Sequence, residues 1–469
     1  MFAKLDFRLS DRMPTETALA LAVCLVVVLT QTLVPEFRRP VADAIGYAHS
    51  VVGVVDAVAA PDRAVNDALG GYLNPVYPLF VAGMALIDDS LLSTLHCLID
   101  TKAACDLSGL TSLFVVQGGM AAFTVFFLFM AVRALAGDSR VAWLVLAIVL
   151  AAKIFSGYAS QLLTECTAFF FVFLFNWLFA RALIMKKPGW PTLVFAGVAL
   201  GLLILTRPSY QYVVPFSVLV LFLWRTFGMR DGVRSGLVVG LAMGAAAGAV
   251  VFPWALRNFM EMGQWTLGTG GPRVLVERLA YNTMTWPEWA VSFIYWLPDF
   301  GDNLARSLFA EDLWKRLTWY EPGSFYMMGR GDFFRTVYGE VAKQEPGNGL
   351  AFLVREYVWG DLGKHLAVSV SLAFRGQWVG NYVSFVGFIL LPFALRILHA
   401  RGRAGPFIVY CLPSYFILGF YAFVSVNVVR YNEPLIAIFA LSIAVVVVRL
   451  VDSGLGRLRR TPSQTRKQS

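Results

Sequence analysis

Long apolar segments separated by short polar stretches dominate the chain. A helix needs about 20 mostly apolar residues to cross the hydrocarbon core of a bilayer. Ten segments meet this need: 15–34, 110–132, 141–158, 164–184, 190–206, 212–229, 235–256, 379–398, 406–426 and 433–451. A further apolar run, 77–87, is too short to span and is expected to lie in the interface or to re-enter partway. The pattern predicts an all-α polytopic membrane protein with about ten transmembrane helices.

Two of the polar stretches are long, and they divide the chain into three parts. An N-terminal membrane module is expected at 1–256, with a first outer loop at 35–109. A second outer loop follows at 257–378, and C-terminal transmembrane helices with a basic tail occupy 379–469. A channel has little need of two large loops on one face, and no inverted repeat typical of many transporters is visible. This asymmetry favours chemistry or recognition at the outer face.

The basic residues indicate which loops face the cytoplasm. With an inner N-terminus, the inside loops and tails hold 20 of the 39 basic residues but only six of the 30 acidic ones. Short cytoplasmic loops are enriched in Lys and Arg, so both termini are predicted to be cytoplasmic. This bias also accounts for the net charge of +9 without a nucleic-acid surface. The first span is not expected to be a cleaved signal, because no small-residue cleavage site follows it.

Composition excludes several classes of protein. Hydrophobic residues make up 58% of the chain and charged residues 15%, and the mean hydropathy is +0.65. Soluble domains carry about 25% charged residues, so a soluble enzyme, a disordered chain and a nucleic-acid-binding module are excluded. A transporter, a channel and a membrane-embedded enzyme remain.

The cysteines and histidines give no metal-binding pattern. Cys24, Cys166 and Cys411 lie in or beside apolar spans and are expected to be small buried hydrophobic residues. Cys97 and Cys105 share the first outer loop and are able to form a disulfide if that loop is in an oxidising compartment, which the sequence alone does not decide. The four histidines are scattered. No cofactor is predicted, although a divalent metal is not excluded.

Charged residues stand at the outer ends of several spans, where they are costly and often functional. They are Lys153, Glu165, Arg207, Arg257 and Arg430. Cations at the outer leaflet run against the distribution of basic residues elsewhere. One explanation is a shared site for an anion such as a lipid phosphate, because the guanidinium fork binds phosphate oxygens in pairs. The alternative is that each side chain extends to ordinary headgroups.

The start of the first outer loop holds an acidic residue close to this predicted cation cluster. Asp43 and Tyr47 are four residues apart, so they share one face if the stretch is helical. Asp43 is a candidate general base, and the alternative is an ordinary surface carboxylate. The second outer loop holds eight of the 13 Trp residues; their rings can stack on sugars or lie at the membrane interface.

Six motifs together resemble the GT-C membrane glycosyltransferases, in particular the bacterial relatives of protein mannosyltransferases and of the lipid A aminoarabinose transferase. The first is Asp43 after span one. The others are LNPVYPLFVAG (73–83), LLTECTAFFFVFL (162–174), GVALGLLILTRPSY (197–210), FPWALRNFMEMGQWTLGTGGP (252–272) and RYNEPLIAIFALSIAVV (430–446). They occur in the order expected for the superfamily and cover residues 43–446.

The resemblance implies a GT-C-like bundle that transfers a sugar from a polyprenyl-phosphate donor to a lipid, glycan or protein acceptor on the outer face. Inversion is expected separately, because a single displacement inverts the anomeric centre. By the same resemblance Asp43 is the catalytic base. Donor-phosphate ligands are Arg207, Arg257, Arg430 and Lys153, and candidate substrate contacts are Tyr47, Asn74, Tyr77, Glu165 and Tyr431. Two departures are visible: Asp43 lacks the adjacent Glu of protein mannosyltransferases, and Asn74 stands where the aminoarabinose transferases have Lys.

The expected protein is therefore a glycosyltransferase of the cell envelope, in a bacterial inner membrane, with no nucleic-acid partner. Two alternatives share its phosphate-binding arginines. One is a transporter or flippase for polyprenyl-linked lipids, and the other is a non-catalytic subunit of envelope-polysaccharide assembly. Neither alternative needs a base at Asp43.

Overall fold

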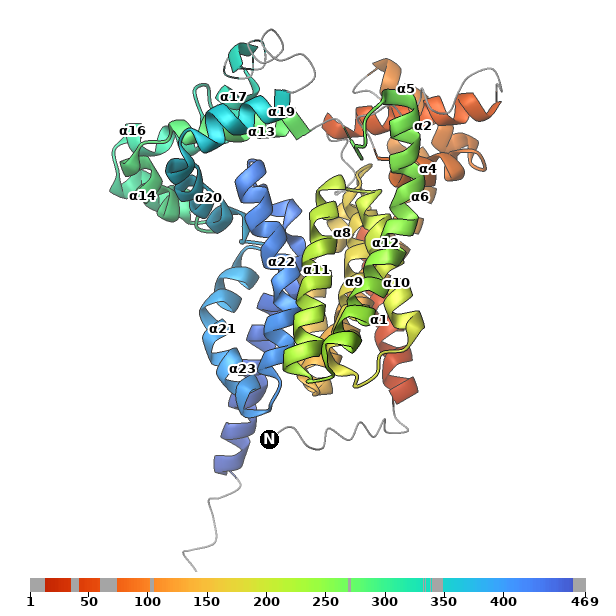
Figure 1. Ribbon diagram of the computed structural model, residues 1–469, viewed down its shortest axis with the longest axis vertical. Helices are drawn as coiled ribbons and strands as arrows, with labels where there is room; N and C mark the ends of the chain where they lie inside the picture. Colours follow the sequence, from red (N-terminus) through yellow and green to blue (C-terminus); the bar gives the residue numbers. More distant parts are fainter. Residues whose placement is uncertain are drawn as a thin grey trace, which may run out of the picture.

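The computed structural model describes residues 13–34, 42–59, 74–101, 105–268, 271–331, 333, 335–337, 339 and 349–458. Within these ranges every regular element is a helix. The predicted cytoplasmic termini, at 1–12 and 459–469, lie outside the described residues. Figure 1 shows a helical bundle with two outer parts at its upper end.

Eight helical segments in the described ranges are long and apolar enough to cross a membrane. They are α1 (Met13–Thr32), α6 (Thr111–Ala136), α9 (Glu165–Ile184), α11 (Val213–Leu223) with its short flanking turns η3 (Pro208–Tyr212) and η4 (Trp224–Gly228), α12 (Val233–Met262), α21 (Tyr382–Ala400), α22 (Ala404–Val424) and α23 (Ile436–Leu458). Each coincides with a predicted span, so the polytopic all-α prediction is confirmed.

Two predicted spans are shorter helices. The span at 141–158 is divided at Lys153, whose φ of 53° is left-handed, into α7 (Ser139–Ala152) and α8 (Ile154–Ala159). The span at 190–206 is α10 (Trp190–Ile204). It stops before Arg207, because a residue that precedes proline is biased towards extended backbone and Pro208 follows. At 14 and 15 residues, both helices fall short of the about 20 that a perpendicular crossing needs.

Close helix contacts hold the bundle together. Helix α6 packs against α1, α7 and α9, while α9 packs on α10 and α10 on α12. Gly197 and Gly201 of α10 make the last contact: a Cβ on Gly197 would lie 2.2 Å from the backbone oxygen of Met243, and one on Gly201 would lie 2.6 Å from Val250. Small residues four apart are a common way to bring membrane helices together. Helix α23 completes the bundle against α7 and α21.

The first outer part consists of α2 (Ala42–Ala59), α4 (Val76–Ala85), α5 (Asp89–Thr101) and the short turn η2 (Leu107–Leu110). At 10 residues, α4 confirms that the run at 77–87 does not span. Cys97 and Cys105 form a disulfide, which answers the question that the sequence leaves open. Cys24, Cys166 and Cys411 are free and buried, as predicted.

The second outer part is a set of short helices between α12 and α21. They are α13 (Gly271–Leu279), η5 (Ala280–Thr283), α14 (Trp286–Tyr295), α15 (Gly301–Leu308), α16 (Glu311–Trp314), η6 (Lys315–Leu317), α17 (Phe325–Arg330), α19 (Gly349–Leu353), η7 (Val354–Trp359) and α20 (Leu362–Gly376). Buried Arg278 joins this part to the bundle, because it donates to the backbone oxygens of Ala422 on α22 at 2.8 Å and of His365 on α20 at 3.0 Å.

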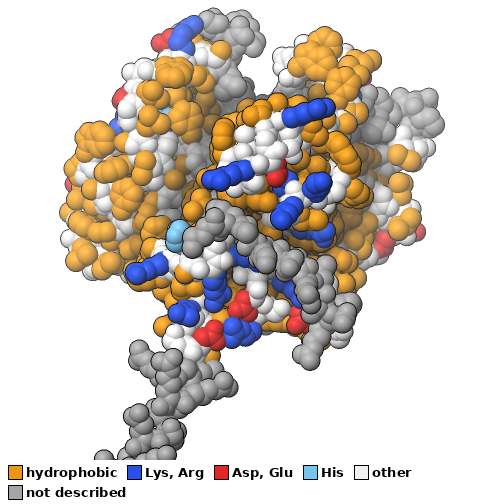
Figure 2. Space-filling view, turned by 60° about the horizontal axis from the view of Figure 1, so that its bottom comes forward, with side chains coloured by type: hydrophobic (Ala, Val, Ile, Leu, Met, Phe, Trp, Pro, Cys, Tyr) orange, Lys and Arg blue, Asp and Glu red, His pale blue; other side chains and the backbone are white. Residues whose placement is uncertain are grey.

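The opposite end of the bundle is rich in basic residues. Figure 2 shows Lys and Arg side chains gathered on the face that comes forward there. Arg140 binds Asp452 at 2.7 Å, which ties the start of α7 to α23. Arg403 donates to the backbone oxygen of Ala134 at 2.9 Å, which ties the loop before α22 to α6. The loops predicted to be cytoplasmic therefore meet at one end.

Candidate functional site

Charged side chains from four separate segments meet at the end of the bundle that carries the outer parts. The Glu165 Oε1 atom lies 2.6 Å from Nη2 of Arg207 and 3.4 Å from Nε of Arg430. Nη2 of Arg430 donates to Oδ2 of Asp43 at 3.2 Å. One carboxylate thus bridges two guanidinium groups, and the second of these carries a further carboxylate. We call Asp43, Glu165, Arg207 and Arg430 the charged cluster.

Local sequence explains where each member of the charged cluster stands. Glu165 is the first residue of α9, and a helix N-terminus stabilises a negative charge. Arg207 has extended backbone, with φ −141° and ψ 106°, as expected before Pro208. Arg430 lies in the turn η8 (Val429–Tyr431), just before η9 (Glu433–Leu435) and α23. Three helix ends therefore direct charge towards the same point.

Burial differs sharply within the charged cluster. The side chain of Glu165 is 2% exposed and that of Arg207 13%, whereas Arg430 is 31% and Asp43 57% exposed. Burial lowers the pKa of Arg207, but the Glu165 carboxylate and nearby tyrosines outweigh it, and the net shift is upward. Glu165 and Arg207 therefore form a buried ion pair. Arg430 and Asp43 are the more exposed members of the charged cluster.

Aromatic rings support the two arginines. The guanidinium carbon of Arg207 lies 5.2 Å from the ring centre of Tyr431, and that of Arg430 lies 5.5 Å from it. Both distances are typical of cation–π contacts. Tyr421 packs against Tyr431 with ring centres 4.8 Å apart. Tyr431, which the sequence indicates as a substrate contact, thus packs against both guanidinium groups.

The first outer part reaches the charged cluster through α2. Tyr47 follows Asp43 by one turn, and its phenol lies close to Thr164, whose Oγ1 accepts from Nε of Arg207 at 3.4 Å. Burial raises the pKa of the Tyr47 phenol, which stays protonated at neutral pH. Its ring meets that of Tyr77 edge-on, with ring centres 5.2 Å apart. The structure therefore places Tyr47 beside the charged cluster and Tyr77 behind it.

The remaining predicted residues occupy different positions. Asn74 precedes α4, whose Val76 N–H donates to the oxygen of Leu205, close in sequence to Arg207. The Oδ1 atom of Asn74 is buried, with no hydrogen-bond partner among the described residues. Arg257 lies on α12, 4.8 Å from the ring centre of Trp254, and donates to Asn258 at 2.9 Å. Lys153 is exposed at the end of α7. None of the described ion pairs joins Arg257 or Lys153 to the charged cluster.

Two residues beside the charged cluster were not identified from sequence. The Tyr158 hydroxyl donates to Oε1 of Glu433 at 3.3 Å. Glu433 is 4% exposed, and its other oxygen has no hydrogen-bond partner in the described part of the chain. Glu433 stands in the motif that begins at Arg430. A charged residue in an otherwise apolar span is often functional, so the sequence could have indicated Glu433 as a site residue.

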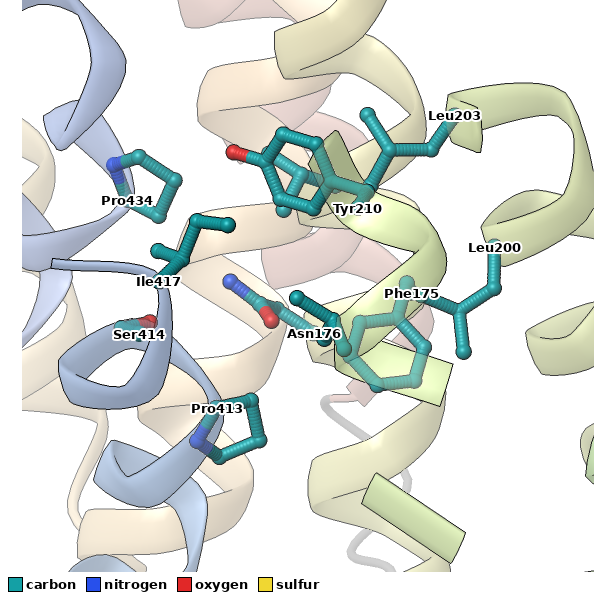
Figure 3. A pocket seen from close by; sticks show the side chains of 11 residues that line it. Phe175, Asn176, Leu200, Leu203, Tyr210, Pro413, Ser414, Ile417 and Pro434 are labelled. Atoms are coloured by element: carbon teal, nitrogen blue, oxygen red, sulfur yellow. The ribbon is translucent and has the colours of Figure 1, made fainter. Parts of the chain in front are cut away.

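A small internal cavity lies below this site, between α9, α10 and α22. Figure 3 shows Asn176 and Ser414 facing it, with Tyr210 and Pro434 above. Its volume is about 10 Å³, which is about the space that one water needs. It is therefore too small for a sugar or a lipid chain. In the described ranges, no three His, Cys, Asp or Glu side chains lie close enough to hold a metal ion.

Comparison with known proteins shows the fold but not a family. No protein-family model matches this chain. A search of curated proteins finds no match either. Among solved structures, the archaeal oligosaccharyltransferase AglB from Archaeoglobus fulgidus, in complex with an inhibitory peptide and a dolichol-phosphate, matches with a TM-score of 0.53 and 12% identity. That match covers 98% of this chain and 53% of the archaeal one.

Two further structures are similar. The apo oligosaccharyltransferase of Archaeoglobus fulgidus gives a TM-score of 0.53 at 12% identity, over 97% of this chain and 53% of that one. ArnT from Cupriavidus metallidurans bound to undecaprenyl phosphate gives 0.36 at 15% identity, over 97% and 82%, a score too low to support an argument. The chain thus spans about half the length of the oligosaccharyltransferases it matches. Its fold is similar to that of GT-C transferases, as the motifs predict.

Proposed function

We propose that this protein transfers a sugar from a polyprenyl-phosphate donor to an acceptor at the outer face of the membrane. The observation that carries the proposal is the charged cluster, in which Glu165 holds Arg207 and Arg430 together beside Asp43. It lies at the end of the bundle away from the basic loops. The fold shared with AglB, whose structure holds a dolichol-phosphate, supports a polyprenyl-phosphate donor.

Arg207 and Arg430 bind the donor phosphate in this proposal. Paired guanidinium groups suit phosphate because each presents two parallel N–H donors. Two such cations would repel each other at short range, and Glu165 offsets this repulsion from a position 2% exposed. Glu165 is thus a positioning residue rather than a substrate contact. Arg257 and Lys153 remain candidates for more distant contacts along the carrier.

Asp43 serves as the base. It is the most exposed member of the charged cluster, and Arg430 is its ion-pair partner at 3.2 Å. A bound phosphate would compete for the same guanidinium group and release the Asp43 carboxylate towards the acceptor. Donor binding therefore frees the base next to the leaving group, which is the order that transfer needs.

The reaction is a single displacement. The acceptor hydroxyl oxygen attacks the anomeric carbon, its proton passes to Asp43, and the bond from the anomeric carbon to the phosphate oxygen breaks. Negative charge grows on the departing polyprenyl phosphate, and the fixed guanidinium groups of Arg207 and Arg430 stabilise it there. One displacement inverts the anomeric centre. NMR comparison of donor and product anomers tests this, and retention of configuration would contradict it.

The natural setting is proposed from the charge distribution. The basic end of the bundle faces the cytoplasm by the positive-inside rule, so the charged cluster faces outward. A bacterial inner membrane with cytoplasmic termini fits this orientation. The chain accordingly acts in assembly of the cell envelope.

Mass spectrometry of envelope glycolipids and glycans tests the proposal. It compares cells that have the gene, cells that lack it, and cells that carry only Asp43→Asn. Loss of one defined sugar in both altered strains, with accumulation of its polyprenyl-linked donor, is expected. Restoration of the glycan by Asp43→Asn would instead support a flippase or an assembly subunit, because neither needs a base.

A further inference from the structure

A second cavity, separate from the charged cluster, lies where the second outer part meets the bundle. Its volume is about 350 Å³, within the range of small-molecule sites. Its walls come from the end of α14, the start of α15, the turn after η6, the α20–α21 junction and η8. Val429 of η8 lines it and immediately precedes Arg430. The cavity therefore borders the segment that carries Arg430 of the charged cluster.

Aromatic rings form much of this cavity. Trp296, Trp319 and Trp378 all line it. The guanidinium carbon of Arg375 lies 4.7 Å from the ring centre of Trp296 and 4.4 Å from that of Trp319. Arg375 thereby fixes the two indoles from one side. Trp296 and Trp378 are buried, whereas Trp319 is partly exposed. Trp319 therefore offers an indole surface on which the apolar C–H face of a sugar ring can stack.

Carboxylates stand on the same cavity. Asp299 and Asp302 both line it, and Asn381 donates to Oδ1 of Asp299 at 3.0 Å. The φ angles of Asp299 and Asn381 are 56° and 49°. Non-glycine residues in this left-handed region are uncommon and gather at functional sites. Asp and Asn adopt this region more readily than other non-glycine residues, and the hydrogen bond between Asp299 and Asn381 holds both on the cavity wall, with the carboxylate of Asp302 in the same lining.

Two N–H groups of residues that line the cavity have no hydrogen-bond acceptor in the part of the chain that the structure describes. Arg375 and Trp378 are 5% and 4% exposed. Nε of Arg375 and Nε1 of Trp378 are buried with no hydrogen-bond partner among the described residues. Both nitrogen atoms are shielded from solvent, so a ligand in the cavity would reach them only after the side chains shift.

We propose that this cavity binds a saccharide, and that the saccharide is the acceptor of the transfer. The partly exposed indole of Trp319 and the carboxylates of Asp299 and Asp302 together match a molecule with C–H faces and hydroxyl groups, because hydroxyl groups donate hydrogen bonds to carboxylates. A peptide would present backbone groups, for which neither carboxylate is needed. The acceptor role rests on the proposed function, whereas saccharide binding in the cavity does not.

The test uses the full-length purified protein and its intrinsic Trp fluorescence. The probes are methyl glycosides and di- to tetrasaccharides of glucose, galactose and mannose, with saturation-transfer NMR as a second readout. Asp302→Asn removes one carboxylate from the cavity, and Asp312→Asn is the matched control, because Asp312 is exposed on α16 outside the cavity lining. At least one saccharide should bind to the wild type, with a Kd at least tenfold higher in Asp302→Asn and unchanged in Asp312→Asn.

Separate outcomes distinguish this inference from the proposed function. If no saccharide binds while acidic, basic or neutral peptides do, the cavity is a peptide site and the inference is wrong. Saccharide binding that Asp302→Asn leaves unaltered also overturns it. Hydrolysis of the donor by water, measured without acceptor as release of polyprenyl phosphate, should be equal in Asp312→Asn and the wild type, because Asp312 lies outside the cavity lining. Absence of that hydrolysis in both, with saccharide binding intact, would contradict the proposed function and leave the binding site standing.

Discussion

Replacement of Arg430 by Gln is the most informative change in the charged cluster. It removes one positive charge but leaves Glu165 paired with Arg207 at 2.6 Å, so the buried ion pair remains. Replacement of Arg207 would instead leave the Glu165 carboxylate with Arg430 at 3.4 Å. Breaking a buried ion pair costs about 3–5 kcal/mol. Arg430→Gln therefore tests binding with less risk to folding.

The size of the expected effect follows from the contact that is lost. A hydrogen bond to a charged group contributes about 1.5–3 kcal/mol. Each 1.4 kcal/mol corresponds to about a tenfold change in affinity. The Kd for a polyprenyl phosphate should therefore rise by about 10- to 150-fold in Arg430→Gln.

The assay is equilibrium binding of a labelled polyprenyl phosphate to the purified protein in nanodiscs. Arg140→Gln is the matched control: Arg140 also contacts two carboxylates, those of Asp138 and Asp452, but lies at the opposite end of the bundle. Its Kd should equal that of the wild type. A well-folded Arg430→Gln protein that binds the lipid within twofold of the wild type would refute the phosphate-binding role.

Three other predictions concern the scaffold. Gly197→Ala should lower the free energy of unfolding by about 1–3 kcal/mol in a chemical-denaturation assay, because the new Cβ would lie 2.2 Å from the α12 backbone. Gly248→Ala is the control and should leave it unchanged, because nothing lies within 4 Å of its new Cβ. Burial lowers the pKa of His365 from 6.5 to about 4, so acidification from pH 6.5 to 4 protonates the unfolded chain first and destabilises the fold by up to about 3 kcal/mol; a His365→Gln variant with the same pH dependence would contradict this. Replacing Cys97 and Cys105 by Ala opens a bridge between residues eight apart and should cost about 2–3 kcal/mol, seen as a lower melting temperature, and unchanged melting would count against the bridge.

The membrane architecture could be predicted from sequence because helix length and apolar content are local properties. The interruptions could not be predicted in the same way. The left-handed backbone at Lys153 leaves no distinct mark in an otherwise apolar stretch. The early end of α10 could have been anticipated from Pro208, since a residue before proline favours extended backbone.

The charged cluster was predictable only to the level of a membrane face. Asp43 and Arg430 are 387 residues apart in sequence. The sequence placed Arg430 at the outer end of a span and Asp43 at the start of the first outer loop. It could not distinguish Arg207 from Arg257, although the first joins Glu165 and the second stacks on Trp254. Side-chain partners depend on helix rotation and packing, which periodicity does not determine in helices that are apolar on most sides.

The cavity of the second outer part shows the same limit. An excess of Trp in that loop is visible from composition, but stacking on sugars and lying at an interface predict the same residue type. Only the fold brings Trp319, Trp378 and Asp302 to one cavity. Contacts between short helices that are distant in sequence form this site, and no local sequence motif predicts it.

The central claim is that Asp43 is the base and that Arg207 and Arg430 bind the donor phosphate. The most direct measurement is single-turnover transfer by Asp43→Asn, together with binding of polyprenyl phosphate to the same protein. Asp89→Asn, an exposed carboxylate of the same outer part, is the control. The account predicts that Asp43→Asn binds the lipid at least as tightly as the wild type but loses transfer by at least 100-fold, while Asp89→Asn retains both. Transfer by Asp43→Asn at the wild-type rate would contradict the account.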